Sequence, residues 1–303
     1  MAPLYHLLDP VWRRTPFPVR PRLQVERPAS LGVTALRMER TWFGNVFMPV
    51  YAWVVGDTLV DTGIDCLWPA VRDATPGVRR ALVSHHHEDH AGNAAALVAA
   101  GVDVRGSELT RRIVARAPPI KLYQHLFWGP MRGAEVQLLG TETEIGPYTA
   151  RVLSAPGHCD DQVVFHVPSE GWLFSGDAFI HEHIRMFRGD EDFHATLATL
   201  ERLLTLDFDG LFCGHRPRFT GGKAALAAKR QWLLDLQGRV LALATKGWGA
   251  SRIVDALELR PRSFASRITF GDASAENLVR AITTGPTPRP EVAACCEASP
   301  AGA

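Results

Sequence analysis

A dense group of potential metal ligands lies in the run His85-His86-His87-Glu88-Asp89-His90. Side chains two residues apart project to the same side of an extended backbone, so His85 and His87 can face one point. Asp89 and His90 follow where the chain is expected to turn into a helix, and they can face a neighbouring point. Imidazole nitrogen and carboxylate oxygen are ligands that suit zinc and similar divalent cations. The run therefore predicts a metal site, the alternative being a solvated polar loop without a role.

Three more polar residues each stand at the end of a short apolar stretch and beside a glycine. They are His158 in Ala155-Pro156-Gly157-His158, Asp177 in Phe174-Ser175-Gly176-Asp177 and His215 in Phe212-Cys213-Gly214-His215. Any one of them alone is more typical of a buried, hydrogen-bonded polar residue. Loops at strand ends, however, are where α/β proteins assemble their sites. Three such positions in series after the histidine run predict that these side chains converge.

The elements that would position these side chains alternate between strand and helix through the first 215 residues. Apolar patterns next to turn residues predict strands over 51–55, 58–61, 78–84, 102–105, 148–154, 162–167, 172–175 and 211–213. Stripes at helical spacing and capping signals predict helices over 67–76, 93–100, 191–205, 223–245, 251–258 and 274–282, with one more from about 108. Ser251 and Ser274 are the expected N-caps of the last two. The alternation predicts an α/β or α+β layered domain with helices behind it.

Composition divides the chain into four parts. Residues 1–30, rich in Pro and Arg, are expected to form an irregular N-terminal arm. Residues 31–222 form the layered domain, 223–284 a helical C-terminal extension, and 285–303 a flexible tail. Within the domain, 117–139 carries prolines and aromatic residues with little periodicity. It is expected to be a surface loop whose aromatics pack on the core, or else an apolar wall or lid over a pocket.

The overall composition excludes several classes of protein. The chain has 303 residues, with 33 Lys and Arg against 32 Asp and Glu, so no basic field favours nucleic acid. Five cysteines do not make a disulfide scaffold, and no apolar run approaches the roughly 18 residues that span a bilayer. The N-terminus lacks the basic-then-apolar order of a secretory signal. We expect a cytoplasmic protein, monomeric or homodimeric, with a small-molecule substrate and no nucleic-acid or membrane partner.

The order and spacing of these residues resemble the metallo-β-lactamase-fold hydrolase superfamily over about residues 40–220. The pattern is His85-x-His87-x-Asp89-His90, then His158, Asp177 and His215, with Leu59-Val60-Asp61-Thr62-Gly63 upstream. The resemblance implies a four-layer αββα sandwich with a dinuclear metal site on one edge of the two sheets. It implies that His85, His87 and His158 hold the first metal, that Asp89, His90 and His215 hold the second, and that Asp177 bridges the two. Asp61 matches the family's acid that orients a ligand or backbone near the site without binding metal.

Single positions narrow the choice among members of the superfamily. Asp177 stands where the commonest zinc β-lactamases carry Cys, and His87 stands where flavodiiron oxygen reductases carry an acid. The complete ligand set is similar to that of glyoxalase-II-like, lactonase-like and phosphodiesterase-like dinuclear members. The helical part after residue 222 is similar in kind to the extensions of glyoxalase-II-like hydrolases. The motif Gly214-His215-Arg216-Pro217-Arg218 departs from the sequence expected around glutathione-thioester hydrolases, so glutathione is not assigned.

These features predict a hydrolase that cleaves an ester, thioester or lactone by attack of a hydroxide shared between two divalent cations. Zinc is the expected metal, with iron or manganese as alternatives. Asp89 is the expected catalytic carboxylate, since it lies beside that hydroxide and can accept or deliver a proton. Two alternatives stay open: an oxidoreductase similar to the persulfide dioxygenases, with a single iron, and β-lactamase or phosphodiesterase activity at the same site.

Four residues that lie near the ligand-type residues in the sequence have both a structural and a functional interpretation. His86 should point away from His85 and His87, since it lies between them in extended backbone. His181 and His183 are expected on the polar surface, with the mouth of a pocket as the alternative. Cys159 is expected to be a small buried residue rather than a redox-sensitive thiol.

Overall fold

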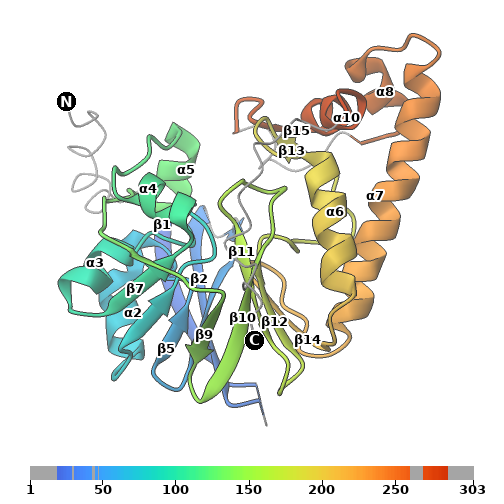
Figure 1. The fold of residues 1–303 in the computed structure, drawn as a ribbon. Helices are drawn as coiled ribbons and strands as arrows, with labels where there is room; N and C mark the ends of the chain where they lie inside the picture. Colours follow the sequence, from blue (N-terminus) through green and yellow to red (C-terminus); the bar gives the residue numbers. More distant parts are fainter. Residues whose placement is uncertain (1–18, 29–30, 43–44, 47, 260–268, 286–303) are drawn as a thin grey trace, which may run out of the picture.

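A computed structural model describes the chain over residues 19–28, 31–42, 45–46, 48–259 and 269–285. Two β-sheets face each other, and helices cover the outer side of each (Figure 1). The layers therefore run helix, sheet, sheet, helix, which confirms the αββα sandwich that the family resemblance implies. No helix within these described ranges is long and apolar enough to cross a membrane.

The first sheet has eight strands, seven of which follow the order β1-β2-β4-β5-β6-β7-β8, while β3 pairs with β2. The strands are β1 (Val19–Glu26), β2 (Val33–Trp42), β3 (Asn45–Val46), β4 (Val50–Val55), β5 (Thr58–Val60), β6 (Arg80–Leu82), β7 (Asp103–Gly106) and β8 (Gln137–Leu138). Pairing is antiparallel from β1 to β5 and parallel from β5 to β8. A tight turn at Gly56, whose φ is +56°, joins β4 to β5 as the sequence predicts.

The sequence predicts an irregular arm over residues 1–30, and this prediction is wrong for the eight residues of β1. This strand is the edge of the sheet and pairs antiparallel with β2, with Pro21 opposite Arg40. A proline has no backbone N–H to donate, which an edge strand tolerates because only one of its sides is paired. The prolines and arginines that suit an edge thus hide the strand pattern in the sequence. Residues 1–18 lie outside the described part of the chain.

The second sheet has five strands in the order β14-β12-β11-β10-β9. They are β9 (Glu142–Ile145), β10 (Tyr148–Ser154), β11 (Val163–Val167), β12 (Trp172–Gly176) and β14 (Gly210–Cys213). Every residue of β11 and β12 is buried, because this sheet is covered on both faces. Between the sheets, the ring of Phe212 packs against those of Trp53 and Phe174, with centroid distances of 5.2 and 4.8 Å. This shared core holds the sheets together, so that loops from both meet at one edge.

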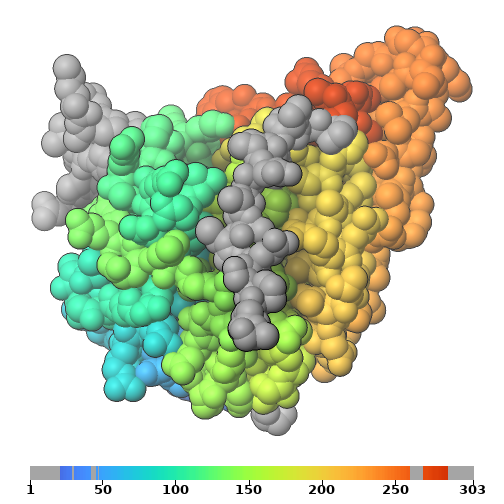
Figure 2. All heavy atoms as spheres, viewed as in Figure 1, coloured from blue at the N-terminus to red at the C-terminus, as the bar shows by residue number. Residues whose placement is uncertain are grey.

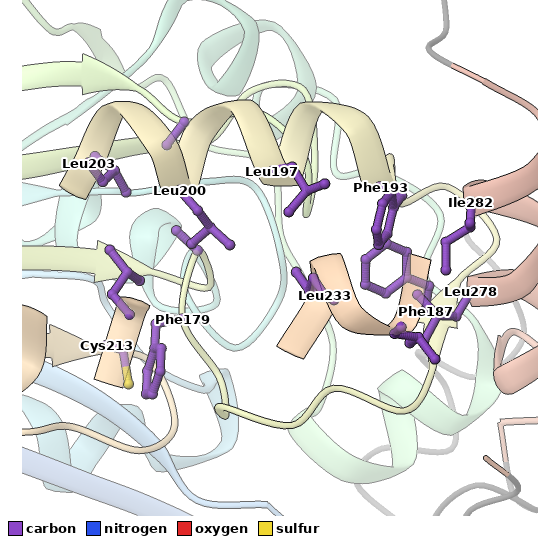
Figure 3. Packing of buried hydrophobic residues seen from close by; sticks show 14 of the residues in the cluster. Phe179, Phe187, Phe193, Leu197, Leu200, Leu203, Cys213, Leu233, Leu278 and Ile282 are labelled. Carbon is purple, nitrogen blue, oxygen red and sulfur yellow. The ribbon is translucent and has the colours of Figure 1, made fainter. Parts of the chain in front are cut away.

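Helices form the two outer layers (Figure 1). On the side of the first sheet lie the short helix η1 (Asp65–Leu67), α2 (Trp68–Ala74), α3 (Ala94–Ala99) and α4 (Glu108–Val114). On the side of the second lie α6 (Phe193–Leu204) and α7 (Gly222–Ala244), followed by α8 (Ala250–Ala256) and α10 (Ala275–Thr283). Figure 3 shows Phe193, Leu197 and Leu200 of α6 in one buried cluster with Leu233 of α7 and Leu278 of α10. The helices after residue 222 therefore pack on the outer layer of the second sheet, while the proposed boundaries at 30/31, 222/223 and 284/285 stay predictions.

Segment 117–139, where the sequence favours a loop, contains helix α5 (Leu122–Trp128). Its first turn is capped by Gln124, whose Oε1 accepts from the backbone N of Lys121 at 2.9 Å. Tyr123 and Phe127, four residues apart, are buried. The helix has seven residues and follows two prolines, so its period is too short to stand out in the sequence.

Of the N-caps predicted for the last two helices, one is confirmed and one is wrong. Ser274 caps α10 as predicted, its Oγ accepting from the backbone N of Asn277 at 3.1 Å. The cap of α8 is Gly249 instead of Ser251, which lies inside the helix. A two-stranded sheet that the sequence does not reveal, β13 (Phe187–Arg188) with β15 (Ala273–Ser274), joins the region before α6 to the start of α10. Of the expected flexible tail, residues 286–303 lie outside the described part of the chain.

Candidate metal centre

Loops at one edge of the two sheets bring the predicted ligand-type side chains together. The first sheet supplies the loop after β6, and the second supplies the residues that follow β10, β12 and β14. We call these seven side chains the metal centre: His85, His87, Asp89, His90, His158, Asp177 and His215. Six of them are buried, and the side chain of His158 is 9% exposed.

Three histidine rings converge at one side of the metal centre. Nε2 of His85 and Nε2 of His158 both lie 3.0 Å from Nδ1 of His87. His85 and His87 leave the same loop two residues apart, as expected from their spacing, and His158 approaches from the second sheet. Three ring nitrogens that face one point suit a shared cation, which accepts a lone pair from each.

Asp177 lies between these three rings and a second group. Its Oδ2 is 3.5 Å from Nε2 of His158 and 3.1 Å from Nε2 of His215, and its Oδ1 is 3.3 Å from Nε2 of His90. Asp89 belongs to the second group, with Oδ2 3.6 Å from Nε2 of His215 and 3.8 Å from Nε2 of His90. The structure thus brings all seven residues together, with the carboxylate of Asp177 between two sets of ring nitrogens.

Asp61, directly after β5, holds the histidine loop from outside the metal centre. Its carboxylate accepts from the backbone N and from Oγ of Ser84, at 2.8 and 3.0 Å, and pairs with Nδ1 of His90 at 2.8 Å. A proton on that Nδ1 leaves the lone pair of His90 Nε2 directed into the metal centre. Asp61 is buried, so water does not compete for these bonds.

The rings of His85 and His215 are oriented in the same way. Nδ1 of His85 lies 2.9 Å from Oγ of Ser84, which uses its own proton on Asp61. Nδ1 of His215 lies 2.8 Å from the backbone O of Pro49. In both rings an oxygen accepts a hydrogen bond from the protonated Nδ1, so the lone pair of Nε2 can bind a cation.

Charges inside the metal centre act on one another. Burial and neighbouring positive groups hold the pKa of His85 and of His87 well below the usual range. Burial acts to raise the pKa of Asp177, but His215 and His90 outweigh it and hold that pKa well below the usual range. Asp177 in turn outweighs the effect of burial on His90 and His215 and raises the pKa of both rings. Asp177 is thus ionised and the rings of His85 and His87 are unprotonated, the forms in which these groups bind cations.

A divalent cation fits this set of donors. Nε2 of His90 and Oδ1 of Asp177 are buried and face each other at 3.3 Å, and neither makes a hydrogen bond with any described residue. A buried polar atom without a partner costs about 1–3 kcal/mol, and a bound cation would offset that cost. Among the described residues, two sets of three whose donor atoms lie within 4.8 Å of one another belong wholly to the metal centre: His85, His90 and Asp177, and Asp89, His90 and His215. Mixed imidazole and carboxylate donors suit zinc, iron or manganese better than calcium, which prefers oxygen alone.

Two neighbours of the ligand-type residues behave differently. His86 turns to the carboxylate of Asp161, which lies 2.8 Å from both its backbone N and its Nδ1. Cys159 has its thiol within 4.8 Å of donor atoms of His85 and His87. Burial and the charge of Asp161 hold the pKa of this thiol well above its usual value, so it is protonated and neutral.

A pocket of about 410 Å³ opens over the metal centre. We call its metal-centre residues the floor: His87, Asp89, His158, Asp177 and His215. We call the other lining residues the wall: Met48, Glu88, Tyr123, Trp128, Ile180, His181, His183, Ile184, Arg185, Met186, Arg188, Glu191, Thr269 and Ala273. Tyr123 and Trp128 come from α5, which supports the interpretation of segment 117–139 as an apolar wall. His181 and His183 likewise line the pocket, the less expected of their two interpretations.

Two wall residues escape the sequence interpretation altogether. Glu88 stands between the ligand-type residues His87 and Asp89 and lines the pocket. Burial and, to a smaller extent, the charge of Asp89 raise its pKa to about 7. Its Oε2 accepts from Nε2 of Gln124 at 3.1 Å. Arg188 reaches the pocket from β13, which has only two residues and is too short to show a strand pattern in the sequence. The position of Glu88 inside the histidine run is a signal for the first, and the sequence holds none for the second.

The wall is closed by a contact between distant parts of the chain. Asp272, just before β15, accepts from Nζ of Lys121 and from the hydroxyl of Tyr123. Figure 2 shows the green surface around α5 beside the orange-red surface of residues 269–285 at the same end of the molecule. The C-terminal helical part thereby contributes to the pocket as well as to the outer layer.

Comparisons with known proteins agree with this arrangement. Residues 46–215 match the family model of the metallo-beta-lactamase superfamily. The chain is similar to hydroxyacylglutathione hydrolase from Rhodobacter capsulatus, 30% identical over 209 residues that cover 65% of this chain and 75% of that protein. Hydroxyacylglutathione hydrolase from Legionella pneumophila (strain Lens) is 26% identical over 188 residues, and the match covers 56% of this chain and 64% of that protein. Among solved structures, a beta-lactamase domain protein from Burkholderia ambifaria has a TM-score of 0.62 at 23% identity, covering 85% of this chain and 89% of that one.

The family match spans more than half of the chain and contains all seven residues of the metal centre. Those residues meet in one buried group whose donors suit divalent cations. The chain therefore belongs to the metallo-beta-lactamase superfamily and is a metal-dependent hydrolase.

Proposed function

We propose that this metallohydrolase cleaves carboxylic thioesters, and related esters, of small molecules at a dinuclear zinc site. The similarity to two hydroxyacylglutathione hydrolases supports a thioester bond as the target. The sequence around His215, which departs from that of glutathione-thioester hydrolases, supports a substrate whose thiol is not glutathione. The apolar wall supports a substrate with an apolar acyl group, since such a group loses contact with water when it enters the pocket.

The donor geometry supports a division of the metal centre into two sets. His85, His87 and His158 would hold one cation, and Asp89, His90 and His215 the other, with Asp177 shared between them. When bound, such a pair of cations lowers the pKa of a water held between them and polarises the carbonyl oxygen of the substrate.

The chain's own residues have three tasks in this reaction. Asp61 keeps the ring of His90, and Ser84 the ring of His85, in the tautomer that binds a cation. The carboxylate of Asp89, at the floor of the pocket, takes up the proton of the attacking water and delivers it to the leaving thiolate. Trp128, Ile180 and Ile184 cover the acyl group and exclude water from it.

One observation carries this proposal: the carboxylate of Asp177 lies within 3.5 Å of ring nitrogens on both sides. Elemental analysis of the purified protein tests the metal part, and we expect about two zinc ions per chain. A single iron per chain, with oxygen consumption on a persulfide, would support the dioxygenase alternative and overturn the proposal.

A panel of substrates tests the reaction. It contains an acyl thioester, a nitrophenyl acetate, a homoserine lactone, a chromogenic β-lactam and a bis-phosphodiester. We expect the thioester to give the highest kcat/KM and the acetate ester to follow. Fastest turnover of the β-lactam or the phosphodiester would contradict the assignment of the bond while leaving the metal centre intact.

A further inference from the structure

One histidine of the metal centre is oriented unlike the others. In three rings the outer nitrogen, the one that faces away from the centre, meets an oxygen acceptor. In His87 the inner nitrogen is Nδ1, and the outer Nε2 lies 3.1 Å from Nη1 of Arg188. A guanidinium group has five N–H donors and no acceptor. The group beside Nε2 of His87 is therefore a hydrogen-bond donor, whereas the other three rings meet an acceptor.

The proton count of the ring decides what this contact means. A neutral imidazole carries one proton, on either Nδ1 or Nε2. When Nδ1 of His87 gives its lone pair to a cation, the proton must be on Nε2. Nε2 and the Nη1 of Arg188 are then two donors, 3.1 Å apart, with no acceptor between them. A single oxygen atom that accepts a hydrogen bond from each of them would satisfy the pair.

Arg188 is held so that this edge of its guanidinium faces the pocket. Its Nε and Nη2 donate to the two carboxylate oxygens of Asp190, at 3.1 and 2.8 Å, which leaves Nη1 on the edge beside His87. Its backbone N donates to Oε1 of Glu191 at 2.9 Å, and its strand pairs with β15. The side chain is 18% exposed, so Nη1 is directed before any ligand arrives. The buried acid of the wall, Glu88, has its own partner in Gln124.

We propose that Nη1 of Arg188 and the Nε2–H of His87 together bind an anionic oxygen of the substrate, a carboxylate carried close to the scissile bond. This inference rests on the proposed function and names its substrate class: thioesters that carry a carboxylate as well as an apolar acyl group. The site forms when His87 binds metal through Nδ1, so recognition of the anion is linked to metal loading.

The test uses zinc-loaded protein and two thioethers without a scissile bond, 3-(benzylthio)propanoate and its amide, 3-(benzylthio)propanamide. These ligands share their shape and differ in charge. Titration calorimetry should show that the wild type binds the carboxylate about 30-fold more tightly than the amide, as two charge-assisted hydrogen bonds allow. Arg188→Gln should weaken carboxylate binding by about 30-fold and leave amide binding within about 3-fold.

Arg239→Gln is the matched control, because Arg239 is an exposed arginine of α7 that does not line the pocket, and its removal changes the net charge equally. It should change neither affinity by more than about 2-fold, since exposed charges are screened by salt. Equal losses in both variants would show a general effect of charge and overturn the proposal. Unchanged carboxylate binding in Arg188→Gln would show that the anion binds elsewhere, for example on zinc, and would overturn it too.

A second measurement keeps the test independent of hydrolysis and of folding. The ¹⁵N spectrum of the histidine rings should show a proton on Nε2 of His87 in zinc-loaded protein, and the carboxylate ligand should shift that signal while the amide does not. A proton on Nδ1 in loaded protein would overturn the proposal. Should Arg188→Gln fail to fold, Arg188→Lys keeps the charge but loses the planar fork, and we expect about a 10-fold weaker carboxylate complex. Absence of thioesterase activity with the carboxylate preference intact would contradict the proposed function alone.

Discussion

The floor and the wall of the pocket come from different kinds of structure. The floor residues leave the ends of β6, β10, β12 and β14, which lie in two sheets packed on one buried aromatic core. Most of the wall comes from the short helix α5, from residues 180–191 and from residues 269–273, which lie outside the two sheets. Met48, before β4, and Glu88, in the loop after β6, complete it. Strand ends fixed by a core hold side chains within the narrow tolerances that metal binding requires. Loops and short helices can change without disturbing that core.

This difference separates what the enzyme does from what it acts on. The floor sets the reaction, because its ligand types and their spacing determine which cations bind. The wall sets the substrate, because its shape and charges meet the part of the molecule that does not react. Substitutions in the floor should therefore remove metal and activity together, whereas substitutions in the wall should change KM and leave the metal in place.

Asp177→Ala is the largest expected break in the floor. Removal of the carboxylate that lies between both sets of nitrogens should cost at least one metal ion per chain and lower kcat/KM by about 1000-fold or more, since metal catalysis supplies several kcal/mol. Elemental analysis and thioester turnover measure the two effects. His86→Ala is the control from the same region, because its ring binds Asp161 outside the metal centre. Full activity in Asp177→Ala, or loss of an ion in His86→Ala, would show that the ligands are misassigned.

Asp61→Asn tests the support of the floor. The amide cannot accept from Ser84 and His90 as a carboxylate does, so the His90 ring loses the partner that fixes its tautomer. We expect metal affinity to fall by about 10–100-fold, the usual effect of removing such a partner, measured by competition with a chelator. Asp57→Asn makes the same chemical change at an exposed carboxylate that binds Arg79, and it should leave metal affinity unchanged. Equal metal affinities in the wild type and both variants would show that Asp61 does not support metal binding.

The same contrast explains how much of the molecule could be predicted from its sequence. The convergence of the metal centre could be predicted, because His85 and His87 stand two apart on an extended backbone and His158, Asp177 and His215 each follow an apolar strand. The alternation of strands and helices could be predicted for a similar reason, since long apolar patterns are independent of distant residues. The αββα order of the layers, by contrast, is implied by the family resemblance. Arg188 could not be predicted, because a guanidinium can reach many targets and the fold alone selects His87. The seven-residue α5 and the edge strand β1 also escaped, since a short period and a proline each hide a local pattern.

Lys229 tests whether the C-terminal helix α7 supports the floor. Its side chain is 4% exposed, and Nζ donates to the backbone O of Ala178, next to Asp177, at 2.7 Å. Burial lowers its pKa from 10.5 to about 8, against the opposing charges of Glu191 and Asp177. Between about pH 8 and pH 10.5 the unfolded chain holds a proton that the folded chain lacks, so the free energy of unfolding rises with pH in this window, by up to about 3 kcal/mol.

Lys229→Met removes that pH dependence while keeping an unbranched side chain. Urea unfolding at pH 7.5 and pH 10, in parallel with the wild type, measures it. We expect the variant to lose stability relative to the wild type as the pH rises, because only the wild type is relieved of a buried charge. A stability difference that is the same at both values would mean that Lys229 titrates as it does in water, and the link from α7 to the floor would then rest on its hydrogen bond alone.

Tyr123→Phe tests the wall and has the smallest expected effect. The variant loses one hydroxyl, which donates to Asp272 and ties α5 to the segment before β15. Asp272 keeps its contact with Lys121, so the wall should loosen without opening. We expect KM for a thioester to rise by about 3-fold, a part of what one hydrogen bond to a charged group contributes, with kcat and zinc content unchanged.

Tyr148→Phe removes the same atom from a half-buried tyrosine of β10 that does not line the pocket, and it should leave KM as it is. The informative result is the combination of constants. A higher KM with constant kcat and metal content means that the wall meets the substrate and the floor does not depend on it. A fall in zinc content in Tyr123→Phe would mean that the contact between α5 and Asp272 also holds the metal ligands in place, and the separation between substrate recognition and chemistry would have to be abandoned.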